Sequence, residues 1–227
     1  MGILIVALLL LALIFAPGLW VRNVLRKYSL PDDRYAGTGA ELARHLLDQQ
    51  GLDAVTVEKT EMGDHYDPLE KAVRLTPDKF DGRSLTAITV AAHEVGHAVQ
   101  DQAAYAPLRL RTKLVRLAVP IQKLGAFALI ASPFIGLIFR LPQLTMLTFA
   151  AGFLTLATST IVHLVTLPTE FDASFGRALP LLDRHNILIP QDKPHARRLL
   201  TAAAMTYVAA SLMSLLNIAR WIAILRR

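Results

Sequence analysis

Long apolar runs alternate along this chain with one extended polar region. Residues 2–20 form an uninterrupted apolar run, long enough to cross a hydrocarbon core of about 30 Å as a helix. Comparable apolar segments cover residues 117–139, 144–168 and 199–225. The pattern predicts a mainly α-helical integral membrane protein with about four transmembrane helices. The first run lacks a basic n-region and a small-residue cleavage site, so we expect an uncleaved anchor.

The polar region combines helical and strand patterns. Leucines recur with helical spacing over residues 39–50, whereas residues 54–57 and 72–76 have β character. The segment Asp64-His65-Tyr66-Asp67-Pro68 has the composition of a turn. We therefore expect a small α+β insert between the first and second spans. The predicted organisation has three parts: an anchor at 2–20, the insert at 21–116, and a membrane region at 117–227 with the other three spans.

A second helix is expected near the end of the insert. Ser84 is a suitable N-cap for a helix over residues 85–102. Its apolar positions follow the helical period and predict one buried stripe, formed by Ile88, Ala91, Ala92, Val95 and Val99. The basic stretch 107–116 that follows is amphipathic, which is typical of a segment at the membrane surface.

Composition and charge support a membrane protein. Hydrophobic residues make up 53% of the 227, and the mean hydropathy is +0.41. The net charge of +6 comes from Lys and Arg that cluster in the insert and in the loop after the third span. By the positive-inside rule this places both in the cytoplasm, and no pattern suggests nucleic-acid binding. Cysteine is absent, so metal ligands must be His, Asp or Glu.

The helix at 85–102 contains a complete H-E-x-x-H motif. His93 and His97 are four residues apart and therefore project from one helical face, where both imidazoles can bind one zinc ion. Glu94 is displaced around the helix, so it can act as general base on a water activated by the metal. The motif predicts one catalytic Zn²⁺ per chain, in an enzyme that hydrolyses peptide bonds.

A catalytic zinc site needs a third protein ligand. The extended motif with a third histidine is excluded, because Gln100 and Ala103 occupy its glycine and histidine positions. Glu170 is the one glutamate after Glu94, and two predicted spans between His97 and Glu170 would return the chain to the same side of the membrane. Other candidates from the same part of the chain stay open: Asp172, Asp183, His163, His185 and His195.

Three segments resemble the YugP-type family of bacterial membrane zinc peptidases. They are Asp64-His65-Tyr66-Asp67-Pro68 with Val73-Arg74-Leu75, the run from Ala91 to Gln100, and Leu167-Pro168-Thr169-Glu170-Phe171-Asp172-Ala173-Ser174. The resemblance implies Glu170 as the third ligand and a neutral zinc metallopeptidase with a gluzincin-like insert. The layout is more distantly similar to HtpX-like peptidases, in which an acid four residues after the third ligand orients a zinc histidine. Here that position is Ser174, and Asp172 is the nearest acid.

Further roles around the metal stay as alternatives. Candidates for stabilising the oxyanion or supporting the ligands are His65, Tyr66, His163, Asp172, Ser174 and Arg177. The strand at 72–76 is a candidate for binding a substrate backbone by edge addition. Because Glu170 follows the third span directly, we expect protein or peptide substrates in or near the lipid bilayer. Association with itself or with other membrane proteins stays open.

The main alternative is a membrane scaffold or chaperone that binds zinc without catalysis. A structural zinc site has no need of Glu94 and usually has a fourth protein ligand. A metal transporter is disfavoured, because the spans lack the paired carboxylates of a cation pathway.

Overall fold

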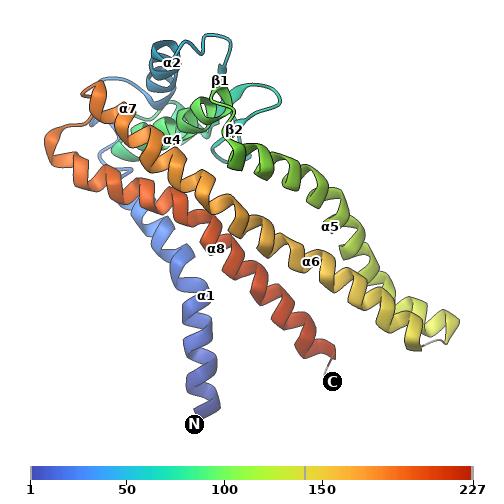
Figure 1. The fold of residues 1–227 in the computed structure, drawn as a ribbon. Coiled ribbons are helices and arrows are strands. Elements are labelled where there is room, and N and C mark those ends of the chain that lie inside the picture. The colour runs from blue at the N-terminus through green and yellow to red at the C-terminus, as the bar shows by residue number, and fades with distance from the viewer. Residues whose placement is uncertain (1, 141, 226–227) are drawn as a thin grey trace. The chain divides into compact units, whose positions relative to one another are not determined.

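The computed structural model describes the backbone of residues 2–140 and 142–225, and some side chains of the first, sixth and last α-helices lie outside the described set. Helices dominate the chain, and three short strands lie between the second and third helices (Figure 1). In order, the elements are α1 (Gly2–Lys27), α2 (Gly39–Gln49), β1 (Thr56–Lys59), β2 (His65–Asp67), β3 (Ala72–Leu75), α3 (Pro77–Phe80), α4 (Leu85–Gln102), α5 (Ala106–Phe139), α6 (Pro142–Phe171), the π-helix η1 (Asp172–Ala178), α7 (Leu179–Arg184), the 3₁₀ turn η2 (Pro190–Asp192) and α8 (Lys193–Leu225).

The chain forms two compact units. One, here called the mixed unit, comprises residues 17–109 and 167–206 and contains the sheet. The other, the helical unit, comprises residues 1–16, 110–166 and 207–227. Segments far apart in the sequence therefore share one core in the mixed unit, which includes Val24, Leu46, Val95, Leu182 and Leu200.

Helix α4 is the centre of the mixed unit. The sequence-based prediction of its bounds is confirmed, and the Ser84 hydroxyl accepts a hydrogen bond from the Ala87 amide as an N-cap. The predicted single buried stripe is too narrow, since every residue from Leu85 to Gln100 is buried. Helix α2 and the sheet contact α4, and so does η1 from the C-terminal half of the chain. Small side chains such as Ala91, Ala92 and Ala98 allow this close packing on several faces.

The sheet has the strand order β1-β3-β2. Strand β1 is parallel to β3, with Val57 opposite Val73, and β2 is antiparallel to β3, with Tyr66 opposite Val73. Both edges of β3 are therefore paired, so the expectation that this strand binds a substrate by edge addition is wrong. The interpretation of residues 64–68 as a turn is also wrong in part, because His65–Asp67 form the edge strand β2.

All the apolar runs of the sequence lie in helices. Among the described residues, a single helix is long and apolar enough to be a candidate membrane span. It is α5, which includes the basic stretch 107–116 and the apolar segment 117–139 as one helix. The prediction of four spans stays a prediction for the other three. In the helical unit, Gly125 of α5 lies against Thr155 and Gly152 of α6, a close approach through small residues that is typical of helices packed in lipid.

Candidate metal centre

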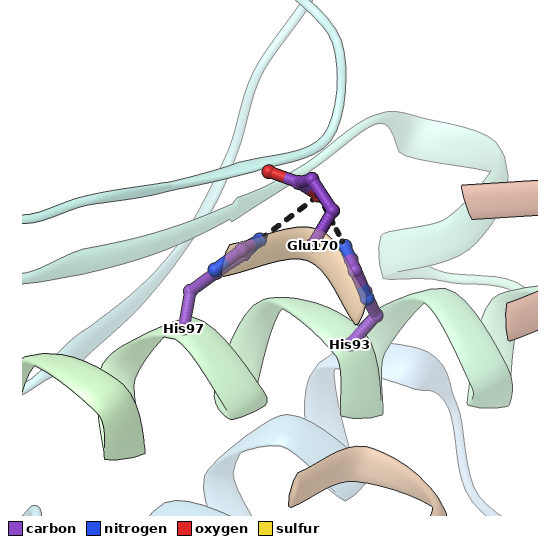
Figure 2. A group of neighbouring side chains, drawn as sticks. All are labelled: His93, His97 and Glu170. Carbon is purple, nitrogen blue, oxygen red and sulfur yellow. Dashed lines mark hydrogen bonds and ion pairs between the residues drawn. The ribbon is translucent and has the colours of Figure 1, made fainter. Parts of the chain in front are cut away.

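Three buried side chains from distant segments converge above α4. His93 and His97 project from one face of this helix, and Glu170 reaches them from the end of α6 (Figure 2). The Glu170 carboxylate oxygen Oε2 lies 3.3 Å from Nε2 of His93 and 3.4 Å from Nε2 of His97. All three side chains are at most 6% exposed. The mixed unit therefore brings two histidines of one helix together with a glutamate more than seventy positions later, as a candidate set of metal ligands.

The spacing of these atoms suits a zinc ion. Ligand atoms of the three residues all lie within 4.8 Å of one another. Two ligands that bind tetrahedral zinc at about 2.0 to 2.1 Å are themselves about 3.3 Å apart, which matches both distances from Glu170. Two imidazole nitrogens and one carboxylate oxygen are also a usual donor set for catalytic zinc.

The hydroxyl of Ser174 fixes which nitrogen of His93 faces the carboxylate. Ser174 Oγ donates its one hydrogen to the carbonyl oxygen of Leu200, at 3.1 Å. Its contact with Nδ1 of His93, at 3.0 Å, is therefore one in which the histidine donates. The tautomer of His93 that this contact favours has its hydrogen on Nδ1, so that the lone pair of Nε2 points toward Glu170. Of the two residues left open for this support, Ser174 contacts His93.

An unpredicted residue, Gln100, fixes His97 in the same way. Its amide nitrogen lies 2.8 Å from the Thr169 carbonyl oxygen and 2.8 Å from Oδ2 of Asp172, two groups that only accept. Its oxygen must then face Nδ1 of His97, at 3.0 Å, and accept that hydrogen. Gln100 follows His97 by three positions on α4, so its helical spacing was the available signal.

Two imidazole lone pairs and a carboxylate thus point at one another in a buried space. Burial raises the pKa of the Glu170 carboxyl, whereas a positive charge or a proton donor on the side of the two histidines lowers it. An ionised carboxylate at such a depth requires positive charge next to it, which a bound divalent cation supplies. The residues present therefore fit zinc.

The π-helix after Glu170 explains the positions of the next polar residues. Its hydrogen bonds join residues five apart, as between the Leu179 amide and the Ser174 carbonyl. Asp172 and Arg177 are five apart, and Nε of Arg177 lies 3.3 Å from Oδ2 of Asp172. The wider turn therefore places Arg177 next to Asp172.

Other candidates have contacts away from the three ligands. The Tyr66 hydroxyl donates to Oδ2 of Asp101 at 2.7 Å, and burial, followed by the Asp101 carboxylate, raises the pKa of Tyr66. His65 Nδ1 lies 2.8 Å from the carbonyl oxygen of Gly63 within its own hairpin. The side chain of His163, in α6, lies outside the described residues.

The alternatives for the third ligand are engaged elsewhere. Asp183 pairs with Lys193 at 2.8 Å, and the ring of His185 packs edge-on against that of His45. His195 packs against Tyr28, and Asp172 binds Gln100. Glu94 is 6% exposed, and α4 carries it between the two histidines.

Two comparisons with known proteins show the family of this chain. The profile of a family described as "Putative neutral zinc metallopeptidase" matches residues 3–226. The chain is 36% identical over 212 residues to "Putative membrane protease YugP" of Bacillus subtilis (strain 168), which covers 90% of this chain and 88% of that protein. No solved structure shows a significant match. The resemblance seen in the motifs is confirmed, and the chain belongs to this family of neutral zinc metallopeptidases.

Proposed function

We propose that the protein is a zinc-dependent endopeptidase that hydrolyses peptide bonds of membrane or membrane-proximal proteins. The observation that carries the proposal is the convergence of His93, His97 and Glu170 on one point, with Glu94 in the same buried helix. Membership in a zinc metallopeptidase family supports the same reaction class.

The proposed roles follow from the chemistry of the side chains. Two neutral imidazoles and the Glu170 carboxylate hold the ion, and they provide three protein ligands, as catalytic sites do. When bound, zinc lowers the pKa of water and polarises a carbonyl group, which makes hydrolysis feasible near neutral pH. Glu94 takes the proton of the attacking water and passes it to the leaving amine, so that both steps use one carboxylate. Ser174 and Gln100 keep the histidine protons on Nδ1, away from the ligand atoms.

The substrate class follows from the position of Glu170 along the chain. The predicted third span ends at Pro168, only two residues before Glu170. A site so near the end of a membrane helix would reach loops and segments close to the bilayer. The distribution of Lys and Arg favours the cytoplasmic side of a bacterial inner membrane. The name of the relative, a membrane protease, is consistent with this location.

The decisive test is Glu94→Gln in the purified full-length protein and in cells. We expect this variant to keep zinc at the wild-type stoichiometry while peptide cleavage falls by about 10²- to 10⁴-fold, since general base catalysis contributes about that much. Cells carrying the variant should accumulate the uncleaved forms of membrane proteins that the wild type fragments. Glu61→Gln, a change of the same type in an exposed loop, is the matched control and should leave both measurements unchanged.

A non-catalytic zinc scaffold predicts a different outcome. Among the described residues the metal-binding group has three members, whereas a structural zinc site usually has four. Full zinc occupancy with no difference in any membrane-protein fragment between wild type and Glu94→Gln would favour the scaffold and contradict the peptidase.

A further inference from the structure

Gln100 is completely buried, and its amide hydrogen bonds in three directions. Its oxygen accepts from His97 at 3.0 Å, and its nitrogen donates to Thr169 and to Asp172, both at 2.8 Å. Every polar atom of the amide therefore has a partner, which a polar group without contact to water requires. The side chain joins α4 to the backbone and side chains around Glu170.

Thr169 and Asp172, on the side of the Gln100 amide away from the His97 ring, determine which way the amide is oriented. If the amide were reversed, its oxygen would face the Thr169 carbonyl and the Asp172 carboxylate, two acceptors with no hydrogen to offer. Its nitrogen would then face Nδ1 of His97 and favour the tautomer whose proton lies on Nε2. Oδ2 of Asp172 also lies 3.3 Å from Nε of Arg177, which holds the carboxylate in place. The carboxylate thus acts on His97 through the amide.

We propose that Gln100 is the positioning residue of His97. Asp172, held by Arg177, determines that the amide oxygen of Gln100, and not its nitrogen, faces the ring. This inference rests on the metal site of the proposed function. Thr169 and Asp172 lie on either side of Glu170 in the chain, so the segment that supplies the third ligand also orients the second imidazole. The two ligands are therefore placed together, and a shift of one is transmitted to the other.

A neutral amide also solves a charge problem. Partners that orient metal-bound histidines are often carboxylates. A carboxylate at position 100 would lie against Asp172 and near Glu170, and burying like charges together is costly. With an amide at position 100, the nearest negative charge beyond His97 is that of Asp172. This side chain is about a quarter exposed, and Arg177 compensates its charge.

The test compares zinc affinity in full-length protein purified in detergent and stripped of metal. Affinity is measured by competition with a chromophoric chelator, and the visible spectrum of Co²⁺ bound in place of zinc reports the ligand geometry. Gln100→Glu has almost the native shape but no N–H donors, and we expect it to weaken zinc binding by about 10- to 100-fold and to alter the Co²⁺ spectrum. Gln102→Glu, the same change at an exposed position of α4, is the control and should match the wild type.

Two further variants test the part of Asp172. Asp172→Ala leaves all three ligands in place, and it should weaken zinc binding by about 3- to 10-fold. The double variant Gln100→Glu with Asp172→Asn offers an amide donor to the new carboxylate. It should therefore bind zinc more tightly than Gln100→Glu alone.

The outcomes separate this inference from the function on which it rests. Wild-type protein that binds no zinc would overturn both. Zinc binding by the wild type, with equal affinity and an identical Co²⁺ spectrum in Gln100→Glu, would overturn the positioning role alone. A double variant that binds zinc no more tightly than Gln100→Glu alone would remove Asp172 from the proposal. If Gln100→Glu proves unfolded by its thermal midpoint without metal, wild-type affinity in Asp172→Ala would overturn the proposal.

Discussion

A Cβ atom on Gly96 would lie 2.7 Å from the carbonyl oxygen of Ala173. The two residues belong to α4 and η1, and their contact brings the backbone that follows Glu170 against the helix that carries both histidines. Real Cβ atoms do not approach a backbone oxygen so closely, so the second variable position of the H-E-x-x-H motif is occupied here by the residue that the contact requires. The glycine therefore allows α4 and η1 to pack this closely.

Gly96→Ala should therefore push η1 away from α4. The strain of about 1 to 3 kcal/mol from overpacking exceeds the roughly 1 kcal/mol that alanine gains in helix propensity, so the protein is expected to be less stable. Zinc affinity should fall by about tenfold or more, because Glu170 moves with η1. Thermal unfolding without metal and zinc competition measure the two effects. A variant as stable and as tightly binding as the wild type would contradict this account of the contact.

Glu170→Gln should weaken zinc binding by more than about 100-fold, a larger loss than removal of a supporting hydrogen bond causes. The change removes the only charged ligand and keeps the shape of the side chain. Asp183→Asn is the matched control, since Asp183 pairs with Lys193 and should leave zinc affinity unchanged. Zinc competition measures the affinity of both variants. If Asp183→Asn lost more affinity than Glu170→Gln, the assignment of Glu170 as the third ligand would be wrong.

Ser174→Ala should weaken zinc binding by about tenfold. The hydroxyl accepts the Nδ1 hydrogen of His93, and without it the ring is free to rotate or to adopt the other tautomer. The Leu200 carbonyl also loses its donor, so a modest fall in the thermal midpoint of the metal-free protein is expected. The loss of affinity should exceed what the control Thr201→Ala shows, since the Thr201 hydroxyl binds only the Arg197 carbonyl within its own helix.

Asp192 should give the fold a defined dependence on acid. Its buried carboxylate accepts two hydrogen bonds from Arg34, both at 2.6 Å, and one from Tyr35 at 2.7 Å. The hydrogen bond from Arg34, against the opposing effect of burial, holds the pKa of Asp192 below its ordinary value of 3.8. A depressed folded-state pKa stabilises the fold fully above the unfolded value, and the contribution is lost as pH falls through the folded value.

Asp192→Asn should therefore lower the thermal midpoint at neutral pH, and its difference from the wild type should shrink below about pH 4. Circular dichroism of both proteins across pH 2 to 7 measures this. Asp53→Asn, a change at an exposed position, provides the comparison for general effects of acid. A difference that stays constant down to pH 2 would show that the carboxylate charge has no part in the contribution.

Local pattern predicted the element that carries the motif. Ser84, the apolar repeat and the end near Gln102 define α4 because capping and periodicity act within a few residues. Strand β2 was missed because its residues have the composition of a turn, and their pairing with β3 depends on the fold of the hairpin. The full burial of α4 was likewise missed, since it depends on contacts with α2, the sheet and η1, which lie outside the range of local patterns.

By itself the sequence determined the two imidazoles and the acid between them, because four positions of an α-helix place side chains on one face whatever surrounds them. It also narrowed the third ligand to a few residues by elimination. Only the tertiary structure decided that Glu170 meets both rings, that Ser174 and Gln100 orient them, and that a π-helix brings Arg177 to Asp172. These contacts depend on backbone distances between α4 and η1, and such distances follow from packing, which no local spacing encodes.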